Sequence, residues 1–323
     1  MSNLYPWLKP YAEKLNRYIA SGRLPSGLLI ESEGEAGLNL IEYFAGNLYC
    51  ENIKNGQACG HCSPCMMFKA GSYPDFFSIK PEEDSTTIKI DAIRKVTESI
   101  ALASQFEAPR LVVISPAQAM TLAASNSLLK TLEEPSDNTT LILLVDQASA
   151  MPATIRSRCQ QISINNIDMN LVKKWLAEQG CETAEQYLSV ANNMPLVALE
   201  MWQEKALIVR DELFESFSKL FIANASPIEF GSKCVSMKVL PVTNWLASWL
   251  SDLIKIKQGA DKEYLSNIDL YSSLKILAER LELKSLYALS DQLKQLIQLQ
   301  SGQVNQQLSF ENFAINCHLS AIN

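Results

Sequence analysis

Apolar and polar positions fall into blocks of two lengths along the first half of the chain. Short apolar runs, typical of buried strands, are separated by longer stretches whose apolar residues recur three and four positions apart, as in amphipathic helices. The predicted strands cover residues 27–30, 75–79, 110–114, 139–145 and 161–164. The predicted helices cover residues 38–49, 91–102, 122–132 and 152–157. Strands alternating with helices indicate an α/β domain whose parallel sheet is covered on both faces.

Beyond about residue 166 the apolar pattern is helical throughout. A first group of apolar positions runs from Val172 to Met201. Two longer stripes follow, formed by Trp245, Trp249, Leu250, Leu253 and Ile254 and by Leu286, Leu289, Leu293, Leu296 and Ile297. Such stripes are typical of helices that pack in a bundle. We therefore expect three domains: the α/β domain at 1–166, a small helical domain at 167–206 and a helical bundle at 207–323.

Composition excludes several classes of protein. The chain has 323 residues, of which 47% are hydrophobic and 20% charged, with a net charge of −7. This balance argues against a protein that coats DNA or a membrane surface by itself, since both rely on broad basic surfaces. Apolar runs stay well below the ~18–20 residues that a membrane span needs, and the first residues lack a signal-peptide pattern. We expect a cytoplasmic protein, associated with the nucleoid if it works on DNA.

Four of the eight cysteines form a cluster with metal-ligand spacing, Cys50-x8-Cys59-x2-Cys62-x2-Cys65. In a reducing compartment such a cluster indicates a metal site before a disulfide framework. Four thiolates from one loop can surround Zn²⁺ tetrahedrally, which makes the predicted site structural, with no open position for catalysis. An iron–sulfur cluster is the alternative, but its typical run continues with x3-Cys-Pro, which is absent here. The remaining cysteines, 159, 181, 234 and 317, fit ordinary apolar positions.

The first strand leads into a segment where a phosphate-binding loop would lie, Glu31 to Asn39. Such a loop needs a lysine for the phosphates and a Ser or Thr hydroxyl for Mg²⁺. Here the candidate positions are Gly34, Gly37, Leu38 and Asn39, so both groups are missing. The strand at 111–114 is followed by Ser115-Pro116, where a metal-binding acidic pair would be expected. We therefore predict that this chain neither binds nor hydrolyses ATP.

Two segments carry a resemblance to a known family. Residues 126–135 (Asn-Ser-Leu-Leu-Lys-Thr-Leu-Glu-Glu-Pro) and 154–159 (Thr-Ile-Arg-Ser-Arg-Cys) resemble bacterial clamp-loader subunits of the AAA+ class, as do Tyr-Pro-Trp-Leu at 5–8 and the cysteine loop after the first helix. The resemblance covers residues 1–165 and implies a degenerate RecA-like AAA+ domain at 1–166 with a zinc module at 50–65, a lid at 167–206 and a collar at 207–323. Leu196 stands where active members carry a sensing arginine.

The resemblance also implies a role for Arg158, which Ser157 and Cys159 flank. In this family the arginine of the Ser-Arg-Cys motif reaches the ATP site of the next subunit, where a guanidinium neutralises charge on the transferred phosphoryl group. Without the motif, Arg158 would be interpreted as one member of a surface ion pair. The arginine-finger interpretation makes Arg158 the single candidate catalytic residue of the chain.

The implied function is that of a non-catalytic subunit of the DNA polymerase III clamp loader. Its partners would be the loader's ATPase subunits and a delta-type subunit in a hetero-pentameric ring, and through the complex the sliding clamp and primed DNA. Intrinsic activity is not expected, although the holoenzyme is a DNA-directed DNA polymerase. Two alternatives remain open: an autonomous AAA+ ATPase motor subunit and a zinc-ribbon protein that binds nucleic acid alone.

Overall fold

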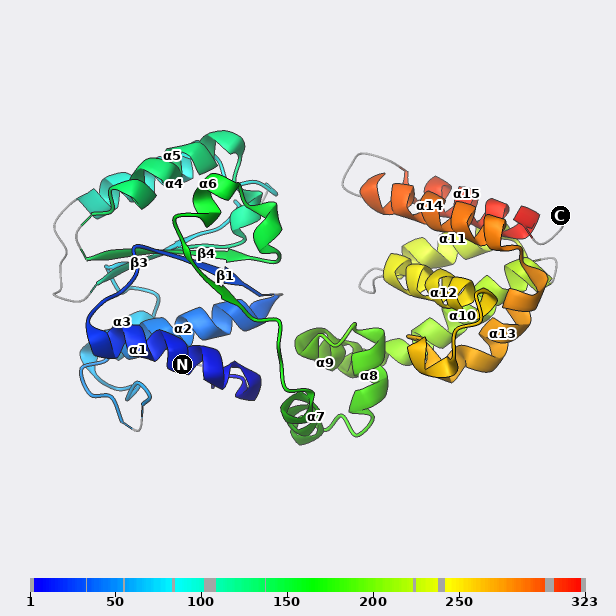
Figure 1. The fold of residues 1–323 in the computed structure, drawn as a ribbon, viewed down its shortest axis with the longest axis horizontal. Helices are drawn as coiled ribbons and strands as arrows, with labels where there is room; N and C mark the ends of the chain where they lie inside the picture. Colours follow the sequence, from blue (N-terminus) through cyan, green and yellow to red (C-terminus); the bar gives the residue numbers. More distant parts are fainter. Residues whose placement is uncertain are drawn as a thin grey trace. The chain divides into compact units, whose positions relative to one another are not determined.

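The computed structural model describes residues 3–32, 34–54, 56–82, 85–101, 109–136, 138–222, 225–237, 242–299 and 305–320, without the side chains of residues 101 and 299. The chain forms two compact units, Met1–Trp175 and Leu176–Asn323, each of which is described by itself (Figure 1). The division falls inside the helix α7 (Met169–Glu178). The expected domain borders near residues 166 and 206 stay a prediction.

The first unit is built on a five-stranded parallel sheet with the order β2-β3-β4-β1-β5. The strands are β1 (Gly27–Glu31), β2 (Phe76–Ile79), β3 (Arg110–Ile114), β4 (Thr139–Val145) and β5 (Gln160–Ser163). Every residue of β3 and β4 is buried, because these central strands have helices on both faces. The α/β fold class predicted from the sequence is therefore confirmed.

Helices cover both faces of the sheet, with α1, α2 and α3 on one side and α4, α5 and α6 on the other (Figure 1). Their bounds are α1 Lys9–Ser21, α2 Glu35–Tyr49, α3 Ser63–Lys69, α4 Ile90–Ala101, α5 Leu122–Glu133 and α6 Ala153–Arg156, with 3₁₀ turns η1 (Pro6–Leu8), η2 (Ala117–Ala119) and η3 (Ala148–Ala150). The predicted helices match α2, α4, α5 and α6 within a few residues. The prediction did not include α1 and α3.

In the described parts of the second unit all regular secondary structure is helical. The unit contains α8 (Ala184–Val190), α9 (Pro195–Gln203), α10 (Ala206–Ile222), α11 (Pro227–Ser236), α12 (Val242–Lys257), η4 (Lys262–Tyr264), η5 (Ile268–Leu270), α13 (Tyr271–Arg280), α14 (Leu283–Leu299) and α15 (Gln306–Ser320). Trp245 and Trp249 are buried in its core, where Trp249 meets Phe214 edge to face with 5.0 Å between the ring centroids. In the second of the two predicted apolar stripes, the prediction is wrong for Ile297, whose side chain is 40% exposed and not part of the core.

Close helix contact in this unit depends on one glycine. A Cβ at Gly231 of α11 would lie 2.5 Å from Cγ and 3.0 Å from the backbone nitrogen of Glu311 on α15. Both distances are shorter than real Cβ contacts, so a larger residue would force the two helices apart. None of the helices in the described part of the chain is long and apolar enough to cross a bilayer.

Candidate functional site

The loop that would hold phosphate is short, and the structure explains why glycine occupies positions 34 and 37. β1 ends at Glu31 and α2 begins at Glu35. Gly34 has φ +58° and ψ −143°, a backbone conformation that favours glycine. At Gly37 a Cβ would lie only 2.3 Å from Cδ1 of Leu144 on β4. Gly37 therefore lets the first turn of α2 pack directly against the sheet.

Leu38 and Asn39, which follow Gly37, make contacts that differ from those expected of nucleotide-binding residues. The Leu38 side chain is 38% exposed and offers no donor to a phosphate. Asn39 is buried; its Nδ2 donates to the carbonyl of Asn3 (3.2 Å), and its Oδ1 accepts from the backbone N–H of Tyr5 (3.1 Å). At one of the positions where a phosphate-binding loop would be expected to carry a Mg²⁺-binding hydroxyl, an amide thus fixes the chain's own N-terminal segment.

Aromatic packing holds this N-terminal segment in place. The ring of Tyr5 stacks on Trp7 with 5.0 Å between centroids, and Trp175 meets both rings edge to face. Burial raises the pKa of Tyr5, and the nearby carboxylates of Glu35 and Glu42 raise it further. The phenol is therefore harder to ionise than a free tyrosine.

Glu31, at the carboxyl end of β1, is committed to neighbouring elements. Its Oε1 accepts from the backbone N–H of Ala148 (2.9 Å), and its Oε2 accepts from the Ser163 hydroxyl. The Ser163 and Ala148 hydrogen bonds lower the pKa of Glu31. This carboxylate joins β1 to β5 and to η3, a role that the sequence analysis did not foresee. Glu33 lies outside the described residues.

The end of β3 carries hydrogen bonds but no carboxylate. The backbone N–H of Ser115 donates to the carbonyl of Ile79 on β2 (3.0 Å), and Pro116 follows. Besides Glu31, this edge carries Asp146, directly after β4, whose Oδ2 accepts from Nε2 of Gln118 (2.6 Å). A strand-by-strand search for acidic residues at the carboxyl ends would have found Asp146.

The four clustered cysteines come together at the other end of α2. The sulfur atoms of Cys50, Cys59, Cys62 and Cys65 all lie within 4.8 Å of one another. In a tetrahedral Zn²⁺ site with Zn–S bonds of about 2.3 Å, sulfurs are about 3.8 Å apart. The arrangement therefore fits a metal ion with modest contraction. His61 hydrogen-bonds through Nδ1 to the carbonyl of Cys59 (2.8 Å) instead of joining the sulfurs.

Backbone amides point at the sulfur atoms, as expected for a thiolate site. The N–H groups of Asn52 and Cys59 donate to the sulfur of Cys50 (3.3 and 3.2 Å). The hydrogen bond from the His61 backbone is the main cause that lowers the pKa of Cys59 to about 6, whereas burial raises that of Cys65 to about 12. A divalent cation binds the thiolate form and would displace the remaining protons.

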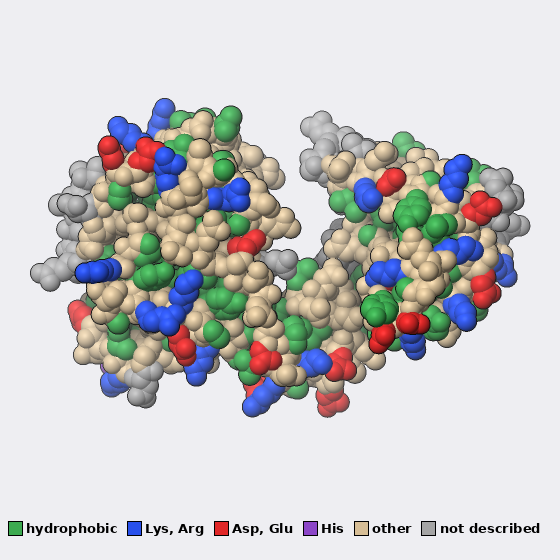
Figure 2. Space-filling view, in the orientation of Figure 1, with side chains coloured by type: hydrophobic (Ala, Val, Ile, Leu, Met, Phe, Trp, Pro, Cys, Tyr) green, Lys and Arg blue, Asp and Glu red, His purple; other side chains and the backbone are tan. Residues whose placement is uncertain are grey.

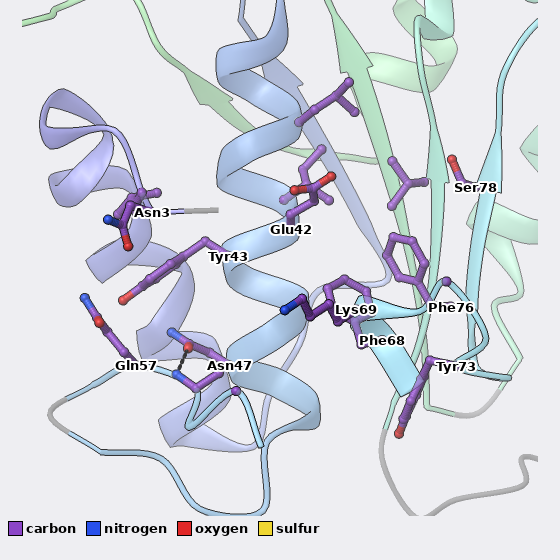
Figure 3. A pocket seen from close by; sticks show the side chains of 17 residues that line it. Asn3, Glu42, Tyr43, Asn47, Gln57, Phe68, Lys69, Tyr73, Phe76 and Ser78 are labelled. Atoms are coloured by element: carbon purple, nitrogen blue, oxygen red, sulfur yellow. Dashed lines mark hydrogen bonds between the residues drawn. The ribbon is translucent and has the colours of Figure 1, made fainter. Parts of the chain in front are cut away.

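The cysteine loop is fastened to α2 by a buried amide. Asn47 donates through Nδ2 to the carbonyl of Gly56 (3.1 Å) and accepts at Oδ1 from the N–H of Ala58 (2.7 Å). The Tyr43 hydroxyl also donates to Gly56 (3.0 Å). Beside this anchor lies a cavity of about 700 Å³, lined by α2, α3, β2 and the loop (Figure 3).

Arg158 lies where the strands of the sheet begin, here called the amino edge. The loop at Gly34 lies where the strands end, here called the carboxyl edge. Arg158 precedes β5, and its backbone carbonyl would be 3.2 Å from a Cβ at Gly27, the first residue of β1. β1 spans five residues, so the two edges are about 13 Å apart along the strand. The structure therefore does not bring Arg158 together with the degenerate loop of its own chain.

The surroundings of Arg158 combine a fixed backbone with an accessible guanidinium. Nη1 donates to the carbonyl of Thr154 (2.8 Å), and Nη2 pairs with Oε1 of Glu133 (2.5 Å). The Ser157 hydroxyl also donates to Thr154 (3.1 Å). Cys159 packs against the core, and burial raises its pKa to about 11. The surface ion pair weighed as the alternative for Arg158 does exist in this structure, with Glu133 as its partner.

Comparisons with known proteins address the family of the chain. Residues 8–168 match a family model described as "DNA polymerase III, delta subunit", and residues 204–318 match "DNA polymerase III, delta subunit, C terminal". The chain is 29% identical to DNA polymerase III subunit delta′ of Pseudomonas aeruginosa, covering 91% of this chain and 90% of that protein. It is 30% identical to the Haemophilus influenzae subunit delta′ (81% and 80%) and 28% identical to that of Escherichia coli (88% and 86%).

Solved structures are more distant. A DNA polymerase III gamma subunit-related protein from Thermotoga maritima is 18% identical, with coverage of 96% and 99% and a TM-score of 0.43. The Bacillus subtilis DNA clamp loader delta protein is 11% identical, with coverage of 95% and 99% and a TM-score of 0.35. The family assignment rests on the sequence matches, which extend over both units. The chain belongs to the family of clamp-loader delta′ subunits of DNA polymerase III.

Proposed function

We propose that this chain is a non-catalytic clamp-loader subunit that supplies Arg158 in trans to the ATP site of a neighbouring subunit. The observation that carries the proposal is the place of Arg158, on the sheet edge opposite the loop at Gly34. A side chain there has no triphosphate of its own chain to act on. A guanidinium supplied across an interface stabilises phosphoryl-transfer charge and is worth about 10³–10⁵ in rate.

The chain's own nucleotide site is proposed to be inactive. This is supported by the Asn39 hydrogen bonds to the N-terminal segment and by the exposed Leu38 in place of a lysine. Neither residue supplies the positive charge or the Mg²⁺ ligand that ATP hydrolysis requires. Micromolar binding of Mg-ATP by the isolated chain would support the autonomous-ATPase alternative.

The four-cysteine cluster is proposed to hold a structural Zn²⁺. Cys50, Cys59, Cys62 and Cys65 would supply all four ligands, leaving no site for water, so the ion would act as a cross-link between α2 and α3. One equivalent of zinc per purified chain is expected, and Cys62→Ser should lose it. A chain that purifies with intact fold and no metal at all would contradict this assignment.

Residues 207–323 are proposed to form the collar of a hetero-pentameric ring with the ATPase subunits and a delta-type subunit, with residues 167–206 as the lid. Apolar side chains remain exposed on helices α11 and α15 of the proposed collar, among them Ile228, Leu308, Ile315 and Leu319. On the face shown in Figure 2, acidic and basic side chains alternate on each unit, which disfavours a protein that binds nucleic acid alone. The assembled ring would open the sliding clamp and load it onto primed DNA.

The test is ATP turnover of the reconstituted loader with Arg158→Ala in this chain. We expect normal assembly, measured by gel filtration, and a fall of about 10³-fold in turnover at the one ATP site that Arg158 completes. Clamp loading onto primed DNA should fall in parallel. Unchanged turnover in a fully assembled complex would refute the arginine-finger role.

A further inference from the structure

Glu133 is the one carboxylate that the structure places on Arg158 within the described residues. The two residues are 25 positions apart in sequence, and their contact joins the end of α5 to the turn after α6. On the assumption of the proposed function above, we infer that Glu133 is a positioning residue that aims the arginine toward the neighbouring ATP site.

The ion pair has little value for folding. The side chains of Arg158 and Glu133 are 36% and 50% exposed, and an exposed pair of this kind adds little to the stability of the fold. Glu133 is also the last residue of α5, where the negative end of the helix dipole makes a carboxylate unfavourable. Neither the helix dipole nor the stability gained from the ion pair therefore explains a glutamate at this position.

The pair does restrict the arginine. The Arg158 backbone is fixed, since its N–H donates to the carbonyl of Ile155 (3.0 Å) and its carbonyl lies against Gly27. Its long side chain has considerable rotamer entropy, which binding in a single orientation would lose. Thr154 and Glu133 hold one guanidinium nitrogen each, so this loss occurs before the partner subunit docks.

The guanidinium keeps donors for a ligand while it is held. It has five N–H bonds, and one bond each goes to Thr154 and Glu133. The other donors suffice for the forked contact that a phosphoryl group accepts. Glu133 can therefore stay bound during the reaction, and the two contacts together fix the direction of the fork.

The test is a double-mutant cycle in the reconstituted loader, with kcat and KM for ATP as readouts. Glu133→Ala should lower kcat about five- to tenfold with little change in KM, because a misaimed finger loses contacts made in the transition state. Glu133→Gln, which keeps an acceptor oxygen, should lose less. Glu134→Ala is the matched control, since it removes the same charge from the adjacent exposed position.

The decisive comparison is the Arg158→Ala background. If Glu133 acts through Arg158, adding Glu133→Ala to Arg158→Ala should have no further effect, and thermal unfolding and assembly should not change. A Glu133→Ala loss equal to that of Glu134→Ala, or a further loss in the double variant, would overturn the positioning role and leave the finger intact. Full turnover with Arg158→Ala would instead overturn the proposed function itself.

Discussion

The two edges of one parallel sheet have opposite character in this protein. At the carboxyl edge, the polar side chains of Glu31 and Asn39 are used for contacts inside the chain. At the amino edge, Arg158 lies exposed, with its backbone fixed and its guanidinium only partly engaged. Ligands of open α/β sheets usually bind at the carboxyl edge. Here the candidate chemistry lies at the other one.

Under the proposed function, the difference is that between a site whose function is lost and a site whose function is kept. Residues that hold a triphosphate need positive charge and free donors, and each becomes a structural residue once its donors are bound within the chain. A cation that acts on a neighbour needs a rigid backbone and an accessible end. The family assignment applies to the whole chain, so it does not tell the two sites apart. The geometry of their side chains does.

One substitution made at each edge sharpens the comparison most. Gly27→Ala would place a Cβ 2.9 Å from Leu132 and 3.2 Å from the Arg158 carbonyl, and Gly37→Ala would place one 2.3 Å from Leu144. Overpacking should destabilise both variants by about 1–3 kcal/mol. Gly27→Ala alone should lower ATP turnover of the assembled loader, by about tenfold, because it displaces the arginine.

Equilibrium unfolding in urea and turnover below the melting temperature check this pair. The added helix propensity of alanine at position 37, about 1 kcal/mol, reduces the loss there but does not remove a clash this close. Equal turnover losses in the two variants would mean that general instability, and not the position of Arg158, controls the rate.

An effect on stability without an effect on turnover is expected at the carboxyl edge for Asn39→Ala. The substitution leaves the N–H of Tyr5 and the carbonyl of Asn3 without their partner, which should cost about 1–3 kcal/mol in the free energy of unfolding. Binding of Mg-ATP should not appear, and turnover of the loader should stay normal. Calorimetric titration of the variant with Mg-ATP checks the first point, with Leu38→Ala as the exposed control.

The smallest effect concerns pH. The folded protein lowers the pKa of Glu31, so this group adds stability above its ordinary pKa of 4.5, and the contribution is lost as pH falls through the lowered value. Glu31→Gln should therefore lose less stability than the parent chain between pH 6 and pH 3. Parallel stability curves for the two proteins would show that the Ser163 and Ala148 contacts do not depend on the charge.

The sheet was predictable because its central strands are continuous apolar runs, such as Leu141 to Val145. The helix α3 was not predicted: it has seven residues, and its pattern is dominated by the cysteine spacing. Ile297 lies on a stripe with the right period and is still exposed. Periodicity places a residue on a helix face but does not tell how wide the buried part of that face is.

The candidate site also has features that the sequence predicted and features that it did not. The cysteine cluster followed from spacing, since all four cysteines lie within one short segment, 50–65. The missing phosphate ligands were also visible in the sequence. The contact of Asn39 with the N-terminal segment, more than 30 residues away, and the pair of Arg158 with Glu133 were not, because no local pattern encodes a contact between distant elements.

Affinity for a transition-state analogue tests the central claim most directly. In the reconstituted loader, binding of ADP with aluminium fluoride should weaken at least about 100-fold on Arg158→Ala, while affinity for ATP in the ground state stays nearly constant, because an arginine finger acts on charge that develops during transfer. Equal affinity of the parent and variant complexes for the analogue would contradict the account.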